Sequence, residues 1–377
     1  NAELFIAANN AQTAQTVTLD HTMVELVSGK TYAAEESIEI PALRGVILVP
    51  ADQAVEITVN TADLAPAYDP AYIVGAEQPE PEIIASGWSG HTTWTLNDRG
   101  VLTFTGSGNM KNYDYNGGQP WQSYADQITA VVIENGVTAI GEGAFKDLTK
   151  LESVTLPTTG LTKIGEAAFY GCTALKEITI PEGIYTIWAY TFKGCTSLSK
   201  VKLPKTLIKI DQGAFENCTA LTYIYFPTNV EIIGAWSFKG CTGLKSVDLY
   251  GADATEIGEG AFKNCASLTT IILPDTVTII SPMAFSGCSA LRGLHLPDGL
   301  QTIGPEAFAG CADLEAITVP ASVEHIAPGV FDDCASLRYI FYGGTFEDWD
   351  ALYSDYINPF TTAICLDGGY YHGSPVD

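Results

Sequence analysis

Apolar residues recur along most of the chain in fixed columns rather than in long amphipathic stretches. Nine phenylalanines lie 23 or 24 residues apart between Phe145 and Phe331. Each has an isoleucine five residues before it and a leucine six residues after it. A unit of this size cannot bury its own apolar face, but stacked units bury matching columns in one shared core. The spacing therefore predicts a β-rich repeat solenoid of nine turns of about 23 residues.

The pattern within one repeat predicts two short strands and a turn. Branched apolar residues stand nine and eleven positions after each phenylalanine, as at Val154 and Leu156, with a polar residue between them. This alternation is typical of a strand, and the proline that often follows it ends the strand. A second short strand is expected over the segment from Val137 to Ile140 and its equivalents. The Ala-Phe-x-x-Cys segment is expected to form the turn that inserts phenylalanine between layers.

The flanking segments divide the chain further. Residues 1–76 hold five alternating or β-branched segments (TVTLD, MVELV, SIEI, GVILVP and AVEITVNT), which predict a small all-β domain. Residues 77–135 are expected to form a linker and an N-terminal capping hairpin, and 136–343 the solenoid. Residues 344–377 are expected to form a C-terminal cap, with Phe346, Trp349 and Leu352 packed on the last turn.

The repeats resemble a known bacterial class. Segments such as FKGCTSLSKVKLP and AFSGCSALRGLHLP are similar to BspA-like leucine-rich repeats over about residues 136–343. WTLNDRGVLTFTGSGNM followed by PWQSY resembles the hairpin that often precedes such arrays, and FYGGTFEDWDAL resembles the segment that closes them. The resemblance implies an extracellular or cell-surface location in a bacterium, binding of proteins or other surface ligands, and no catalytic residues.

The net charge of the chain limits the classes of partner that it is expected to bind. The chain carries 18 basic and 44 acidic side chains, a formal charge of −26. Residues 146–263 hold 12 of each sign, so a neutral middle lies between two acidic ends. Such a chain is a poor ligand for nucleic acid or anionic lipid. No apolar run approaches the roughly 18 residues of a membrane span, so no membrane insertion is expected.

The cysteines and histidines give no indication of a catalytic or metal-binding site. Eight of nine cysteines stand three residues after a phenylalanine. Parallel side chains in one column neither converge tetrahedrally on a metal nor aim well for disulfides, so we expect buried thiols. The five histidines lack paired spacing, and no nucleophile elbow, Walker loop or calcium loop is present. We therefore expect no enzyme, no metal and no cofactor.

The exposed positions of the first strand in each repeat are the best candidate binding surface. These positions, eight and ten residues after each phenylalanine, are expected to face the concave side. Most are small or polar, but two neighbouring repeats carry Lys200 and Lys202 beside Tyr223 and Tyr225. Tyrosines and charges in one strip are typical of recognition surfaces. The alternative is that tyrosines suit strands and lysines maintain solubility. Tyr339 and Phe341 are expected to be covered by the C-terminal cap.

A second candidate surface lies on the turn before phenylalanine. Most repeats place glycine or alanine two residues before phenylalanine, but two repeats place Tyr190 and Trp236 there, with Trp188 nearby. Rings two turns apart, about 10 Å, can form an aromatic strip on which sugars stack. The alternative is that they fill local gaps or pack against the N-terminal domain.

The sequence is compatible with three functions. The first is a non-enzymatic, monomeric surface or secreted protein that binds or adheres to a host or bacterial protein. The second is glycan binding through Trp188, Tyr190 and Trp236. The third is an architectural spacer. The residues name no ligand and do not fix the role or docking of residues 1–76 or the mode of surface anchoring.

Overall fold

The protein is described from a computed structural model. It describes six strands within residues 1–50, then residues 80–114, 117–353, 361–366, 368 and 370–372. The chain divides into two compact units, Asn1–Glu80 and Pro81–Asp377.

The N-terminal unit is built from antiparallel strands. Their order is β1-β6-β3-β4 in one sheet and β2-β5 in another. Four of the five expected strands coincide with β2, β3, β5 and β6, whereas AVEITVNT lies outside the described residues. The two strands that were not expected, β1 and β4, have too little alternation to be recognised. The strands are β1 Phe5–Asn9, β2 Gln15–Thr18, β3 Met23–Glu25, β4 Thr31–Tyr32, β5 Ser37–Ile40 and β6 Arg44–Pro50.

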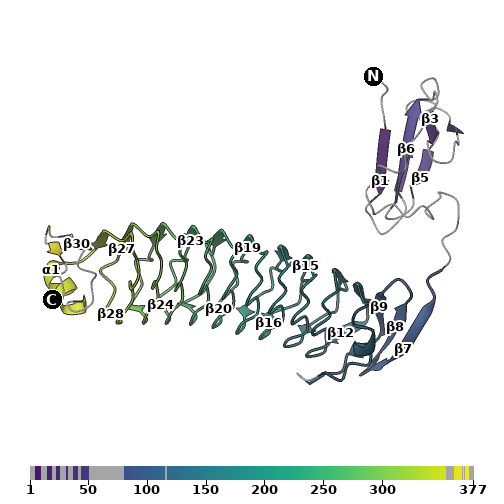
Figure 1. Cartoon of the computed structure of the whole chain (residues 1–377), viewed down its shortest axis with the longest axis horizontal. Helices are drawn as coiled ribbons and strands as arrows, with labels where there is room; N and C mark the ends of the chain where they lie inside the picture. The colour runs from purple at the N-terminus through teal and green to yellow at the C-terminus, as the bar shows by residue number, and fades with distance from the viewer. Residues whose placement is uncertain are drawn as a thin grey trace. The chain divides into compact units, whose positions relative to one another are not determined.

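The second unit is a solenoid with two series of parallel strands, which run along opposite edges of the array (Figure 1). Both series follow the predicted positions, so the repeat solenoid is confirmed. The first series is β11 Ala130–Ile133, β13 Ser153–Thr155, β15 Glu177–Thr179, β17 Lys200–Lys202, β19 Tyr223–Tyr225, β21 Ser246–Asp248, β23 Thr270–Ile272, β25 Gly293–His295, β27 Ala316–Val319 and β29 Tyr339–Tyr342. The second series is β12 Val137–Ile140, β14 Lys163–Ile164, β16 Thr186–Ile187, β18 Lys209–Ile210, β20 Ile232–Ile233, β22 Glu256–Ile257, β24 Ile279–Ile280, β26 Thr302–Ile303 and β28 His325–Ile326.

The strand pairing is interrupted near one end of the array. Among the described strands, the first series breaks between β13 and β15 and again between β17 and β19, and the second series breaks between β14 and β16. The repeat that begins at Phe145 is one residue longer than most, and the extra residue falls between Pro157 and Ile164. Two of the three breaks lie beside this insertion. The repeat that begins at Phe238 is also 24 residues long, yet its strands remain paired with the next turn, so an extra residue alone does not break the pairing.

A continuous stack of phenylalanine rings forms the centre of the array. Successive rings from Phe145 to Phe331 have centroids 5.2–5.8 Å apart. The planes tilt by 26° in the first pair and by 1–12° in the others. All nine rings are buried, and the leucine and isoleucine columns pack around them. Matching residues thus share one core, as the columns predicted.

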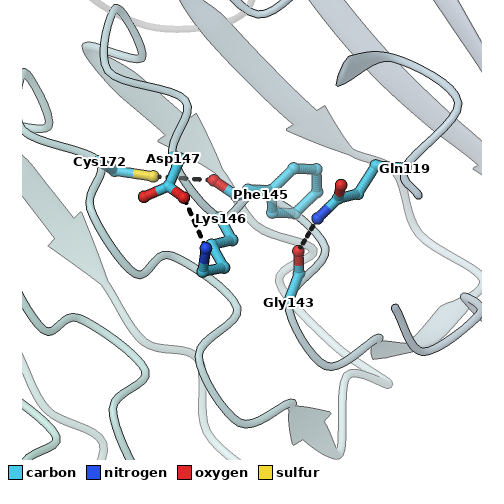
Figure 2. Close-up of polar contacts among 6 residues, drawn as sticks. All are labelled: Gln119, Gly143, Phe145, Lys146, Asp147 and Cys172. Atoms are coloured by element: carbon cyan, nitrogen blue, oxygen red, sulfur yellow. Dashed lines mark hydrogen bonds and ion pairs between the residues drawn. The ribbon is translucent and has the colours of Figure 1, made fainter. Parts of the chain in front are cut away.

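The cysteine column has a polar role as well as a packing role. Each of the eight column thiols donates a hydrogen bond to the phenylalanine carbonyl of the preceding turn, as Cys172 does to Phe145 at 3.1 Å (Figure 2). All nine cysteines are buried and unbridged. Burial raises the pKa of Cys195, Cys241 and Cys288 from 9.0 to about 12. The interpretation as buried thiols is therefore confirmed.

Two backbone positions in each turn adopt the left-handed conformation, which side chains other than glycine take only at a cost. The position two residues after phenylalanine holds only Gly, Asn or Asp, the residues that tolerate it best. The position two residues before phenylalanine is less restricted, because Tyr190 and Trp236 adopt it at φ 57° and 56°. The left-handed conformation is unfavourable for Tyr190 and Trp236, so contacts of these two side chains must offset its cost.

The array begins one turn before the first phenylalanine. The strands β9 Val101–Gly106 and β10 Gly108–Asn109 pair in parallel with β11 and β12, and a 3-10 turn at Gln122–Tyr124 follows them. Trp121 occupies the place of phenylalanine in this turn, with its ring centroid 6.1 Å from that of Phe145. Its indole N–H donates to the Ala144 carbonyl at 3.0 Å, and Gln119 donates to Gly143 at 2.6 Å (Figure 2). The antiparallel strands β8 Thr92–Asn97 and β7 Ile83–Ser89 then end the sheet.

The opposite end is closed by helix α1 Phe346–Tyr353 and strands β30 Thr362–Cys365 and β31 Tyr370–His372. Thr345 and Asp348 exchange side-chain-to-backbone hydrogen bonds, a capping box that starts α1. Trp349 is buried against Tyr342, but Phe346 is 37% exposed.

One expectation for this end was wrong. Tyr339 and Phe341 remain 47% and 42% exposed. The reason is that β30 pairs edge to edge with β29, so this strand extends the sheet instead of covering its outer face.

Replacing a central ring should destabilise the array strongly. We expect Phe238→Ala to lower the free energy of unfolding by about 3–5 kcal/mol, since it leaves a cavity between two stacked rings. Tyr250→Ala, which removes a 78% exposed ring, should change it by less than about 0.5 kcal/mol. Urea unfolding followed by circular dichroism measures both, and equal effects would contradict the stack.

The thiol column predicts alkaline unfolding. An unfolded cysteine loses its proton near pH 9, whereas burial holds the pKa of Cys195, Cys241 and Cys288 near 12. The unfolded chain therefore releases protons first, and the free energy of unfolding falls above pH 9 by up to about 1.4 kcal/mol per pH unit for each thiol. Urea midpoints measured from pH 8 to pH 10.5 should show a shallower decline when these three are alanine. Thiolate absorbance in the folded chain near pH 9 would contradict the prediction.

Candidate functional site

The structure brings the four residues of the predicted strip together on one face. Lys200 and Lys202 lie at the two ends of β17, and Tyr223 and Tyr225 lie at the equivalent positions of β19 on the next turn. The residue between each pair is buried, so all four side chains point outward. Tyr223 is 55% exposed and Tyr225 is 71% exposed. The Lys/Tyr strip, as we call these four residues, is therefore exposed on two consecutive turns, although β17 and β19 are not hydrogen-bonded to each other.

A groove lies beside the Lys/Tyr strip where the first strand series is interrupted. It has a volume of about 510 Å³ and is lined by residues of β13, β15 and β17 and by the prolines that follow these strands. Lys200 and Lys202 line it, whereas Tyr223 and Tyr225 do not. The repeat columns give no sign of this groove. The 24-residue spacing after Phe145 does not mark it either, because the same spacing follows Phe238, where β21 and β23 remain paired.

The charges at the groove are accessible to a partner. Lys200 lies 3.5 Å from the Glu177 carboxylate, but the two side chains are 65% and 69% exposed. Such a pair contributes little to stability and exchanges partners readily. Glu182 accepts hydrogen bonds from the backbone N–H groups of Lys205 and Thr206, which hold it near the rim. The two lysines can therefore turn toward an incoming acidic group.

The aromatic residues of the second candidate surface have partners within the array. A side chain at Gly213 would meet the Tyr190 ring at 2.7 Å, and one at Gly260 would meet the Trp236 ring at 2.4 Å. Each ring thus lies over the glycine of the next turn, and each is half-buried. Trp188 is 39% exposed, with the Lys163 ammonium 5.2 Å from its ring centroid. Packing on the next turn accounts for Tyr190 and Trp236.

A buried carboxylate joins the turns that carry these rings. Glu216, whose side chain is 8% exposed, lies 2.8 Å from Lys193 and 3.2 Å from Lys239. The same lysines lie 5.1 and 5.9 Å from the ring centroids of Tyr190 and Trp236. Partial burial lowers the pKa of Lys193, but the Glu216 carboxylate outweighs it, so this pKa lies above its ordinary value. This cluster stabilises three consecutive turns.

Among the residues that the structure describes, Glu216 is the only buried charged residue. The described part of the chain contains no group of three or more His, Cys, Asp or Glu side chains placed to hold a metal ion. None of its helices is long and apolar enough to cross a membrane.

Comparison with known proteins identifies the repeats. The model of the BspA type leucine-rich repeat region matches residues 122–245 and 255–350 in 6 copies. A comparison with curated proteins finds no match.

Solved structures of bacterial leucine-rich repeat proteins are also similar to this chain. One is a leucine-rich cell surface protein from Faecalibacterium prausnitzii A2-165, with 24% identity over 74% of this chain and 100% of that chain and a TM-score of 0.32. A leucine-rich repeat protein from Eubacterium ventriosum ATCC 27560 has 20% identity over 69% and 79% and a TM-score of 0.43. Another, from Bacteroides ovatus ATCC 8483, has 23% identity over 73% and 98% and a TM-score of 0.31.

Removing the charge of the buried Glu216 should destabilise the protein more than removing the charge of the exposed Glu177. We expect Glu216→Gln to lower the free energy of unfolding by about 1.5–3 kcal/mol, because two partly buried lysines lose their charged acceptor. Glu177→Gln, on the exposed pair with Lys200, should cost less than about 1 kcal/mol. Urea titrations of both variants make the comparison, and an equal cost would contradict the structural role of Glu216.

Proposed function

Because the chain belongs to the BspA-type leucine-rich repeat family, we propose that it is a non-enzymatic binding protein on the surface of a bacterium or secreted from it. The family is one of protein-interaction scaffolds. In this proposal, the array holds the Lys/Tyr strip and the neighbouring groove rigid for a protein on a host or bacterial surface. A rigid surface needs little ordering on binding, so more of the contact energy appears as affinity.

The observation that carries the proposal is the composition of adjacent exposed positions. In the first strand series, β17 carries two lysines and β19 two tyrosines, and all four side chains are exposed. Tyrosine provides a large contact area at low conformational cost, and lysine provides charge complementarity. The groove beside the lysines adds a concave, partly apolar floor that includes Ile178 and Leu203.

The charge distribution favours an acidic partner. Residues 1–145 have 4 basic and 18 acidic groups, and residues 264–377 have 2 and 14, so their net charges are −14 and −12. An acidic protein segment is repelled by these two acidic stretches of the chain and finds complementary charge among the lysines of residues 146–263. The exposed lysines then steer association, and binding should weaken as salt rises.

The test is a four-residue variant of the Lys/Tyr strip, with Lys200→Ser, Lys202→Ser, Tyr223→Ala and Tyr225→Ala. The matched control is Lys150→Ser, Lys245→Ser, Tyr185→Ala and Tyr250→Ala, which removes the same groups from other exposed positions. Each immobilised protein captures partners from host mucosal and bacterial surface extracts at about 0.15 M salt. The captured proteins are then titrated against all three forms.

We expect the strip variant to bind captured acidic proteins at least about tenfold more weakly than the control does. Raised salt should release the same proteins from the unaltered chain. Equal affinity of both variants, or capture that does not change with salt concentration, would show that the Lys/Tyr strip is not the binding surface.

A further inference from the structure

The N-terminal end of the array carries an exposed sheet face that the repeats do not explain. Strands β7, β8 and β9 pair antiparallel and continue the first strand series through β11 to β13. The outward positions form two rows across the sheet. Register places Trp88, Thr93 and Thr105 in one row, and Ser86, Thr95 and Thr103 in the other.

Trp88 stands out among the tryptophans of this end. Its side chain is 74% exposed, whereas Trp94 and Trp121 are 4% and 0% exposed in the core beneath it. The backbone forces this orientation. Gly87 packs so closely on Trp94 that an added side chain would lie 2.9 Å from the indole nitrogen. Because neighbours in a strand point to opposite faces, Trp88 must point outward.

Hydroxyl-bearing residues lie in register with Trp88 on the two neighbouring strands. Thr93 and Thr105 share a hydrogen bond of 2.8 Å between their hydroxyl oxygens. Each hydroxyl has one hydrogen to donate and two lone pairs, so a bonded pair still offers sites to a ligand. Strands β7, β8 and β9 contain no Asp, Glu, Lys or Arg. The charged residues next to these strands lie at the rim of the face. Glu82 precedes β7, and Asp98 and Arg99 lie in the turn between β8 and β9. Glu134, which follows β11, lies beside Thr105.

We propose that this face binds a neutral polysaccharide. A sugar ring presents an apolar C–H surface, which stacks on an exposed indole, and hydroxyls at its edge, which pair with threonine and serine. A neutral chain loses no ion pairs and leaves no buried charge unpaired on this face, whereas a charged ligand would be desolvated with no opposite charge on β7, β8 or β9. Neighbouring strands lie about 4.8 Å apart, so the threonine rows offer hydroxyls at regular intervals along an extended ligand.

This site differs from the Lys/Tyr strip in place and in chemistry. It lies on the antiparallel end strands, whereas the strip lies on β17 and β19. It should respond little to salt, because no charged side chain belongs to its strands. Loss of one site should therefore leave the other intact.

The experiment is native affinity electrophoresis of the full chain in gels that contain a soluble β-glucan, a xyloglucan or a mannan. The variants are Trp88→Ala and the pair Thr93→Val with Thr105→Val. The matched control is Tyr250→Ala, which removes an exposed ring elsewhere. None of these changes alters net charge, so any change in migration reports binding or folding. Circular dichroism and urea midpoints check that the variants fold.

We expect at least one polysaccharide to retard the unaltered chain and the Tyr250→Ala control equally. Trp88→Ala should weaken binding about tenfold or more, and the double threonine variant should weaken it measurably. Absence of retardation in all three gels, or retardation that survives Trp88→Ala, would overturn the proposal. A concentration-dependent dimer that only Trp88→Ala converts to monomer would overturn it in favour of self-association.

Discussion

The turn around each phenylalanine is the constraint on which the rest of the structure depends. Its ring stacks on the next ring, its N–H donates to a carbonyl of the next turn, and its carbonyl accepts the next cysteine thiol, as at Phe145, Ala168 and Cys172. The turn reaches this geometry only through a left-handed residue on each side of the phenylalanine. The ring, the thiol and the backbone of each turn therefore restrict which residues fit beside them. As a result, the same few residue types recur at these positions in successive turns.

This internal restriction leaves the surface free to differ from turn to turn. Exposed strand positions contact no column, so lysines, tyrosines or small residues fit there equally well. A repeat protein can thus keep one core and change its binding surface one turn at a time. The break in the strands beside β15 shows the complementary case, in which an interrupted pairing accompanies a groove at the surface.

Sequence reasoning succeeded where residues repeat and failed where they occur once. The columns predicted the stack, the buried thiols and the outward positions of Lys200 and Tyr223, because each position in one turn recurs in the next. They missed Trp121, which fills the phenylalanine site with a different residue and moves the start of the array by one turn. They also misjudged Tyr339 and Phe341, because sequence alone did not show that β30 adds to the sheet edge. The groove and the outward position of Trp88 depend on local pairing, which periodicity does not reveal.

A crystal structure of the full chain would show directly whether the phenylalanine rings share one core. We expect the nine rings from Phe145 to Phe331 to form one unbroken stack, with every successive pair of centroids 5.2–5.8 Å apart. Trp121 should continue that stack at its first turn. Rings divided among separate cores, or any of the nine turned into solvent, would contradict it.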